Sequence, residues 1–205
     1  MELREAVRTR RMVRSYDPTR PIPRDELENL LNLAIRAPSA GHTQAWRFLV
    51  LDDITSRDSF WSATTEDGAS NSWLDRLRTA PVLIIFFSDQ QAYLDRYAEP
   101  DKGWIDKDPD RWPVPYWHID TGMAAMILLL AAQDAGLAAC FFGVPKDRWP
   151  ALFEAFHVPP GLEPIGVVSL GHPAPDLRSP SLKRGRRSLP EVLTYGSFDV
   201  ESPSS

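Results

Sequence analysis

The chain has 205 residues and a mass of 23.1 kDa, which suits one domain, with or without a lid, and leaves little room for two. Apolar residues make up 43% and charged residues 25%, the balance of a soluble globular chain, so a disordered or collagen-like protein is excluded. The single cysteine, Cys140, excludes an intrachain disulfide and a cysteine-based zinc site.

The sequence shows no targeting or membrane segment. Residues 1–5 lack the apolar stretch of a signal peptide, and the longest apolar run, within 121–132, is shorter than the roughly 20 residues of a membrane span. We therefore expect a cytoplasmic protein. The net charge of −5 argues against nucleic-acid binding.

The basic residues gather near the two ends of the chain. Residues 1–24 carry seven arginines and three acids, and residues 178–187 carry five basic side chains and no acid. Two separate solvated faces would explain this pattern. Convergence of both clusters on one anion, such as a phosphate, would explain it too, because arginine supplies planar bidentate donors.

In the first half of the chain, apolar residues recur at helical spacing over 24–36, and Pro38 ends this pattern. The run at 81–88 is apolar without alternation, which predicts a strand buried on both faces. In chain order, we expect a short helix over 2–9, the helix over 24–36, a small polar loop over 37–44, a strand over 46–51, a polar helical stretch over 56–80 and the strand over 81–88.

The second half begins with an irregular segment over 99–115, which holds four prolines. We interpret it as a possible lid, because so long a loop in a compact domain is usually functional or disordered. We then expect a helix over 116–136, strands over 139–142 and 164–170 that flank a helix over 146–156, a final helical turn over 188–194 and a polar tail over 199–205.

The predicted helix over 116–136 is apolar on opposing faces. One stripe holds Met123, Met126, Ile127, Leu130 and Ala131, and the other holds Ala124, Ala125, Leu128, Leu129 and Ala132. A helix that is apolar all round must be buried all round. In a chain of this size a second copy is the simplest cover, so the sequence predicts a homodimer.

Several common catalytic motifs are absent from the sequence. No two of the 11 glycines stand as Gly-x-Gly, which excludes the dinucleotide fingerprint, and the P-loop and the Gly-x-Ser-x-Gly elbow are also missing. The four histidines form no His-x-x-x-His pair, so no metal site is expected. A bound cofactor would have to be held by side chains and irregular backbone.

Several segments in a fixed order resemble the FMN-dependent nitroreductase family of NAD(P)H:flavin oxidoreductase-like proteins. That family opens on Arg-Arg-Ser-x-Arg, followed by Pro-Ser-x-x-Asn-x-Gln-x-Trp. This chain has Arg10-Arg11-Met12-Val13-Arg14 and Pro38-Ser39-Ala40-Gly41-His42-Thr43-Gln44-Ala45-Trp46. The likeness continues at 119–124, 136–143, 166–173 and 184–192, so it covers nearly the whole chain.

The resemblance implies an α+β fold in which a central mixed, mostly antiparallel sheet is flanked by helices. It implies one FMN-binding domain over 1–198 and an intertwined homodimer that binds FMN at the subunit interface, with the helix over 116–136 in that interface. In such a dimer the two basic clusters would meet at the FMN phosphate, which is the second interpretation of the charge pattern.

The resemblance also implies roles for the basic residues at the phosphate. Arg10 matches the family's phosphate-binding arginine, and Arg184 and Arg186 match its C-terminal pair. Arg11 and Arg187 are the alternatives if the register differs by one residue.

Two residues of the N-terminal motif differ in what they imply. Arg14 matches the residue at the pyrimidine edge of the flavin, where a cation stabilises the reduced form and tunes the potential. Met12 replaces the family's serine, and a thioether donates no hydrogen bond to a phosphate.

In the polar loop, Pro38, Ser39 and Ala40 match the segment that lines FMN from the other subunit. His42 stands in place of the family's asparagine and can still donate one hydrogen bond, or it is simply an exposed loop residue. Gln44 is expected to fix the loop or to contact the pyrimidine ring.

Phe142 and Gly143 match the segment whose backbone N–H faces flavin N5, where many relatives have Glu-Gly; core packing is the alternative role for Phe142. Aromatic residues near the possible lid are candidates for a cover over the flavin or for simple packing. These are Trp104, Trp112, Tyr116 and Trp117.

The implied activity is hydride transfer from NAD(P)H through FMN to nitroaromatic, quinone or similar acceptors. Other flavin reactions on the same fold remain open: an oxidase, flavin fragmentation or reductive dehalogenation. A non-catalytic flavin-binding or storage protein would show the same motifs.

Overall fold

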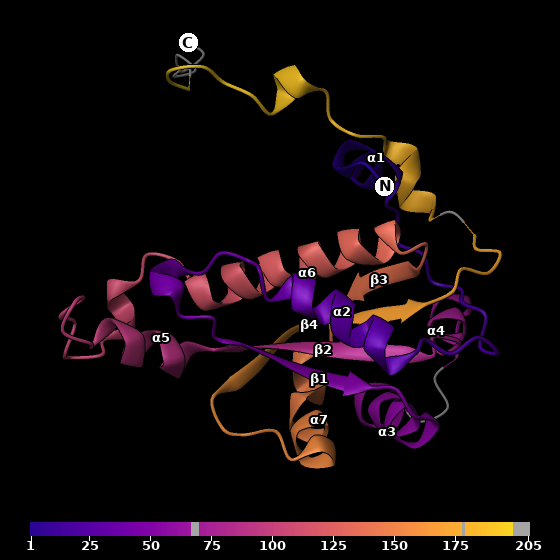
Figure 1. Cartoon of the computed structure of the whole chain (residues 1–205), viewed down its shortest axis with the longest axis horizontal. Coiled ribbons are helices and arrows are strands. Elements are labelled where there is room, and N and C mark those ends of the chain that lie inside the picture. The colour runs from indigo at the N-terminus through magenta and orange to yellow at the C-terminus, as the bar shows by residue number, and fades with distance from the viewer. Residues whose placement is uncertain (67–69, 178, 199–205) are drawn as a thin grey trace, which may run out of the picture.

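The structure, a computed structural model, describes residues 1–66, 70–177 and 179–198, and it is organised around one antiparallel sheet (Figure 1). In the described part of the chain the sheet has four strands in the order β1-β2-β4-β3, and all neighbouring strands are antiparallel. A separate parallel bridge joins Met12 to Ala139. The strands are β1 (Trp46–Leu51), β2 (Val82–Asp89), β3 (Ala138–Phe142) and β4 (Leu162–Gly171).

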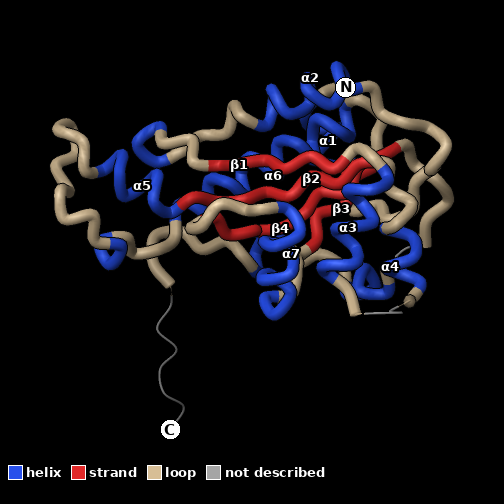
Figure 2. Tube along the Cα trace, turned by 90° about the horizontal axis from the view of Figure 1, so that it is seen from below, coloured by secondary structure: helices blue, strands red, loops and turns tan. Residues whose placement is uncertain are grey.

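Helices cover both faces of this sheet. Figure 1 shows α2 (Arg24–Ala34) and α6 (Tyr116–Asp134) on one face, and α3 (Ile54–Thr64) and α7 (Trp149–Phe156) on the other. Figure 2 shows α4 beside α3 at one end of the sheet and α5 at the opposite end. The remaining helices are α1 (Leu3–Thr9), α4 (Ser72–Leu77) and α5 (Gln90–Tyr97), with 3-10 turns at Ala40–His42, Pro109–Arg111, Lys146–Arg148, Pro180–Arg184 and Leu189–Glu191.

The strand β2 separates two hydrophobic cores, as its unbroken apolar run predicts. Val82, Ile84 and Phe86 pack with residues of α2 and α6. Their neighbours in sequence, such as Leu83 and Ile85, pack with residues of α3 and α7. Successive side chains of a strand point to opposite faces, so every apolar residue of this strand is buried. The predicted α+β fold with a mostly antiparallel sheet is confirmed.

One stripe of α6 is buried against the sheet, whereas the other is only partly covered: Ala131 is buried, Ile127 and Leu130 are half-buried, and the two methionines are exposed. Ala124 and Leu128 are fully buried, whereas Met123 and Met126 are each 40% exposed, with Ile119 beside them at 39%. One copy of the chain therefore leaves an apolar stripe of its longest helix in contact with solvent. No helix among the described residues has the length and apolarity needed to cross a membrane.

Some elements differ from the sequence-based expectation. The stretch over 56–80 is not one helix but two, α3 and α4, which are started separately by the side chains of Asp53 and Asn71. The helix α5 was not expected, because two turns are too short to show a clear apolar period; the side chain of Asp89 caps it by accepting from the Ala92 N–H. The predicted polar tail over 199–205 lies outside the described residues.

Candidate functional site

The N-terminal arginine motif and the segment after β4 enclose a pocket of about 390 Å³, which we call the arginine pocket. The structure brings Arg10, Arg11, Met12 and Arg14 into its lining together with Arg186. The two basic clusters of the sequence therefore reach the same pocket from opposite ends of the chain. This arrangement favours a shared anion over two separate solvated faces.

Backbone hydrogen bonds hold the two walls of the arginine pocket together. Asp17 N–H donates to His172 O at 3.0 Å, and Ala174 N–H donates to Ser15 O at 3.1 Å. Between them, the buried Tyr16 hydroxyl donates to Val13 O at 2.6 Å and lies 2.7 Å from Ser169 Oγ. These hydrogen bonds tie the residues that flank Arg14 to β4 and to the segment after it. The backbone from which the Arg14 side chain extends is therefore fixed.

Two guanidinium donors in this pocket are buried without a partner. Arg10 Nη1 and Arg14 Nε have no hydrogen-bond acceptor among the described residues. A buried polar group without a partner costs about 1–3 kcal/mol, and more when it is charged. An anionic ligand would remove this cost, so the donor set fits a phosphate group such as the one at the end of FMN.

Met12 directs its sulfur at the sheet. Its Sδ accepts from the Phe141 N–H at 3.4 Å, and the neighbouring Val13 N–H donates to Ala139 O at 3.0 Å. The edge strand β3 thereby gains partners along its free side. This contact gives the methionine a structural role at the position where the family has a serine.

The C-terminal basic residues divide between two hollows. Arg186 lines the arginine pocket. A neighbouring hollow is lined by Arg184, Arg187 and Glu191, and Arg186 also reaches it. Figure 1 shows this C-terminal segment passing beside α1 and extending away from the sheet. The structure therefore places one member of the predicted pair in the arginine pocket. Arg178 lies outside the described residues.

The polar loop lies far from the arginine pocket within one chain. The loop precedes β1 and lies near the first turn of α6. Arg10 directly follows α1, which lies near the last turn of α6, at the opposite end of the molecule (Figure 1). The structure thus does not bring Pro38, Ser39, Ala40, His42 and Gln44 together with the arginine motif. A single site could contain both sets only if the loop came from a second copy.

The polar loop has an unusual backbone. Gly41, His42 and Gln44 all have positive φ, near 62°, 55° and 52°. A left-handed conformation is costly for residues with a side chain and points to a constrained, functional loop. The turn is closed by the Gln44 N–H, which donates to Ser39 Oγ at 3.0 Å. This contact uses the backbone of Gln44, so the role of its side chain stays a prediction.

Three residues that sequence reasoning did not assign hold this loop in place. The buried Asp120 carboxylate accepts from the Ala40 N–H at 2.7 Å and from the Tyr93 hydroxyl through the same oxygen. Arg96 of α5 donates to Gly41 O at 3.0 Å. An acid within an apolar helix is a signal that could have identified Asp120, but nothing in the sequence pairs it with α5.

The two buried tyrosines predict that stability falls at alkaline pH. Burial raises the pKa of Tyr16, and burial together with the hydrogen bond to Asp120 raises the pKa of Tyr93. Unfolded tyrosines ionise near pH 10, while the folded ones stay protonated, so the folded state binds more protons above that pH. We expect the contribution of these two tyrosines to the free energy of unfolding to be constant up to about pH 9 and to be lost above pH 10.

Urea unfolding between pH 8 and pH 11 measures this fall. The Tyr16→Phe variant should lose less stability with pH than the wild type, whatever its offset at pH 8. Exposed Tyr195 provides the control, because Tyr195→Phe should leave the slope unchanged. Equal slopes in the Tyr16→Phe variant and the wild type would contradict the prediction.

Phe142, the last residue of β3, and Gly143 after it line a pocket of about 440 Å³ that also includes Trp61 and Trp73. The Phe142 ring stacks on Trp61, with ring centroids 5.8 Å apart and an interplanar angle of 9°, and Trp73 meets it edge-on. The side chain is therefore part of the core. Only the backbone of Phe142 and Gly143 is therefore left to contact a ligand.

The aromatic residues near the possible lid cluster around Trp112. Its ring centroid lies 4.5 Å from that of Tyr97, 5.5 Å from Trp104 and 5.7 Å from Tyr116, and Trp117 follows at 6.2 Å. These contacts tie the segment over 99–115 to α5, at the same end of the molecule as the polar loop (Figure 1). Within one chain these rings pack on one another, and their predicted role as a cover over the flavin stays a prediction.

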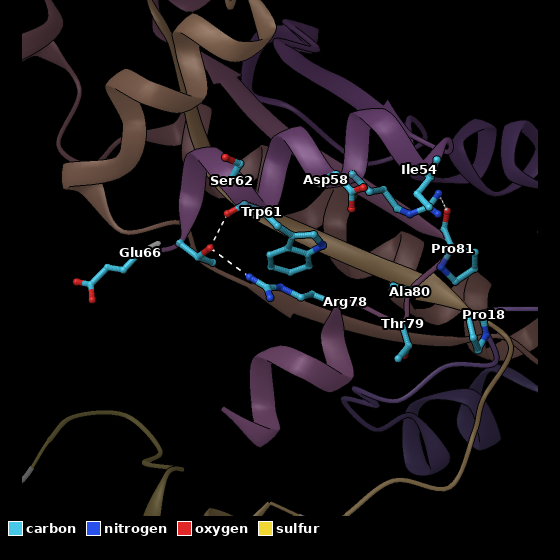
Figure 3. Close-up of a pocket in the computed structure, with 12 residues that line it drawn as sticks. Pro18, Ile54, Asp58, Trp61, Ser62, Glu66, Arg78, Thr79, Ala80 and Pro81 are labelled. Atoms are coloured by element: carbon cyan, nitrogen blue, oxygen red, sulfur yellow. Dashed lines mark hydrogen bonds between the residues drawn. The ribbon is translucent and has the colours of Figure 1, made fainter. Parts of the chain in front are cut away.

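A further hollow, of about 510 Å³, lies between α3 and the turn before β2 (Figure 3). It contains none of the residues singled out in the sequence. Its arginines already have acceptors: Arg57 donates to Pro81 O at 2.7 Å, and Arg78 donates to Thr65 Oγ1 at 3.4 Å. The arginine pocket, which has two buried donors without partners among the described residues, is the better candidate site.

The described residues hold no cluster of three or more side chains suited to bind a metal ion. The arginine pocket instead offers buried guanidinium donors, on Arg10 and Arg14, that suit an anion.

Known proteins resemble this chain over most of its length. A protein of Methanothermobacter thermautotrophicus, provisionally named an NADH dehydrogenase/NAD(P)H nitroreductase, is 27% identical over 85% of this chain and 78% of its own length. The iodotyrosine deiodinase of Nematostella vectensis is 26% identical over 94% of this chain and 74% of its own length.

Solved structures share the fold. A nitroreductase-like protein of Streptococcus mutans superposes with a TM-score of 0.73 at 19% identity, covering 94% of this chain and 97% of that one. A protein of Desulfovibrio desulfuricans, provisionally described as a nitroreductase and solved in complex with FMN, is 26% identical with a TM-score of 0.70, covering 97% and 99% of the two chains. Because the model of the Nitroreductase family matches residues 7–172, most of the chain, this protein belongs to that family.

Proposed function

We propose that this protein is an FMN-dependent oxidoreductase that transfers hydride from NAD(P)H to nitroaromatic, quinone or similar acceptors. The observation that carries the proposal is the buried donor without a partner, Arg10 Nη1, in a pocket lined by four arginines, with Arg14 Nε as a second such donor for another part of the ligand. Such a pocket suits a terminal phosphate, which FMN has and FAD lacks. Membership of the family supports the assignment.

In this proposal the arginines contact two different parts of FMN. Arg10, Arg11 and Arg186 bind the phosphate, and Arg184 joins them from the adjacent hollow. Arg14 faces the pyrimidine edge. FMN, when bound, supplies the two-electron chemistry, while the chain supplies the anchoring charge and the orientation.

We further propose that the working form is a homodimer. The exposed stripe of α6 offers an apolar surface, and the polar loop lies at the opposite end of the molecule from the arginine pocket. A second copy related by a two-fold axis would cover the stripe and bring its own loop, with Ser39, Ala40 and His42, to the arginines of the first. The aromatic cluster around Trp112 would then lie beside the same site as a cover.

The proposal predicts the cofactor content. The protein should purify yellow and release FMN, one per subunit, because the arginine pocket suits a terminal phosphate and the sequence lacks a dinucleotide motif. Absorbance of the denatured supernatant and chromatography against FMN and FAD standards measure this. Release of FAD, or of no flavin after expression in a flavin-replete medium, would contradict it.

Turnover separates an enzyme from a storage protein. Steady-state oxidation of NADH and NADPH should depend on an added nitroaromatic or quinone. A protein that holds FMN but shows no such oxidation with either donor would instead be a flavin carrier.

Reductive dehalogenation is the second candidate, and the relatives favour it over the other flavin reactions. Several of them are named iodotyrosine deiodinases, including the Nematostella vectensis and Danio rerio proteins. The test is anaerobic incubation of the dithionite-reduced protein with iodotyrosine. Release of iodide at a catalytic rate would assign this reaction, and its absence alongside nitroaromatic turnover would assign the first.

A further inference from the structure

Asp176 is an acidic residue in the lining of a pocket that otherwise carries positive charge. It lies five residues after β4, and its side chain is 16% exposed. Among the described residues that line the arginine pocket it is the only acid, beside Arg10, Arg11, Arg14 and Arg186. A carboxylate in such a place would weaken anion binding unless its own charge were satisfied elsewhere.

Both carboxylate oxygens of Asp176 are engaged away from the guanidinium groups of the pocket. Oδ2 accepts from the backbone N–H of Arg14 at 3.0 Å. Oδ1 accepts from Nη1 of Arg76, the arginine in the last turn of α4, at 3.2 Å. Arg76 is not among the residues that line the arginine pocket. The negative charge of Asp176 is therefore balanced from outside.

This arrangement leaves the arginine donors of the pocket available. Arg14 uses Nη1 to donate to Met12 O at 3.2 Å, and its Nε stays buried without a partner. If Asp176 bound the Arg14 guanidinium instead, the bidentate pair would occupy the donors that an anion needs. By holding Arg14 through its backbone, Asp176 continues the hydrogen bonds that join the two walls of the pocket at Asp17 and Ala174.

We propose that Asp176 is a positioning residue for the anion site: it fixes the backbone of Arg14 while Arg76 neutralises it, so that the arginine side chains stay free for the ligand. This inference rests on the proposed binding of FMN in the arginine pocket. Asp176 has no direct contact with the ligand in this role.

Titration of the refolded apoprotein with FMN, followed by quenching of flavin fluorescence, tests the role. Asp176→Ala removes the acceptor of the Arg14 N–H and should raise the FMN dissociation constant roughly tenfold. Asp176→Asn keeps a carbonyl oxygen for that N–H and should stay within about threefold of the wild type. The midpoint potential of bound FMN should fall in the alanine variant alone, because a misplaced Arg14 no longer stabilises the reduced form.

Asp52→Ala is the control, because it removes a second Asp–Arg pair, the more exposed one with Arg24, away from this pocket. It should leave both readouts unchanged. An alanine variant at 176 that loses thermal stability but keeps the wild-type dissociation constant and potential would overturn the inference. So would an asparagine variant as impaired as the alanine variant, since the charge pair with Arg76 would then be what matters. Failure of the wild type to bind FMN would instead refute the proposed function.

Discussion

Replacing Arg10 by alanine is expected to raise the FMN dissociation constant about ten- to hundred-fold, and excess FMN should restore turnover. The reason is that a charge-assisted hydrogen bond contributes roughly 1.5–3 kcal/mol. Arg10 places a buried donor, Nη1, in the arginine pocket without another acceptor among the described residues. The phosphate does not change its charge during the reaction, so the loss should appear in binding alone.

Arg14→Ala should fail in a different way. Its buried Nε, proposed to face the pyrimidine edge, would interact with a part of the flavin whose charge changes on reduction. The variant should have a lower flavin midpoint potential and slower reduction by NAD(P)H even when FMN saturates the site. Redox titration and stopped-flow reduction at saturating FMN measure the two quantities.

Arg20→Ala is the control for both variants, because Arg20 is an exposed arginine of the same N-terminal cluster outside the pocket lining. It should retain the wild-type dissociation constant and potential. If saturating FMN rescues the Arg10 and Arg14 variants equally, Arg14 is only a second anchor and its separate role is wrong.

Local patterns in the sequence were enough to predict the main elements of the fold. The helical spacing of leucines gives α2, the unbroken apolar run gives the doubly buried β2, and the two-sided apolar pattern gives α6. Each of these signals lies within a single segment. The convergence of the two basic clusters was one of two open interpretations of the charge pattern, and the lining of the arginine pocket now favours it.

Contacts between distant segments could not be predicted in the same way. The anchor of the polar loop joins Ala40, Tyr93 and Asp120 from three elements. Asp120 stands out as an acid in an apolar helix, but nothing in the sequence pairs it with Ala40 or Tyr93. The contact of Met12 Sδ with the Phe141 N–H depends on where an irregular segment meets β3. The helix α5 has only two turns and a capping aspartate, so its existence follows from the aromatic packing around it more than from its own sequence.

Placing a charge on the exposed stripe of α6 is expected to separate the subunits and to release FMN together. Met126 is 40% exposed in one chain, and the proposed dimer would bury it. A buried unpaired carboxylate costs about 3–5 kcal/mol. Met126→Glu would place one on each subunit, so we expect the dimer to weaken by at least about a thousandfold.

Light scattering coupled to size exclusion, with absorbance at the flavin band, reads both consequences in one run. Ile54→Glu is the control, because Ile54 is an exposed apolar residue of α3 on the opposite face of the sheet, and it should remain a dimer that holds FMN. The Met126 variant should elute as a colourless monomer, since the polar loop and the arginine pocket lie at opposite ends of one chain. A monomer that keeps FMN at micromolar concentration would show that one chain completes the site, and a variant that stays dimeric would place the interface elsewhere.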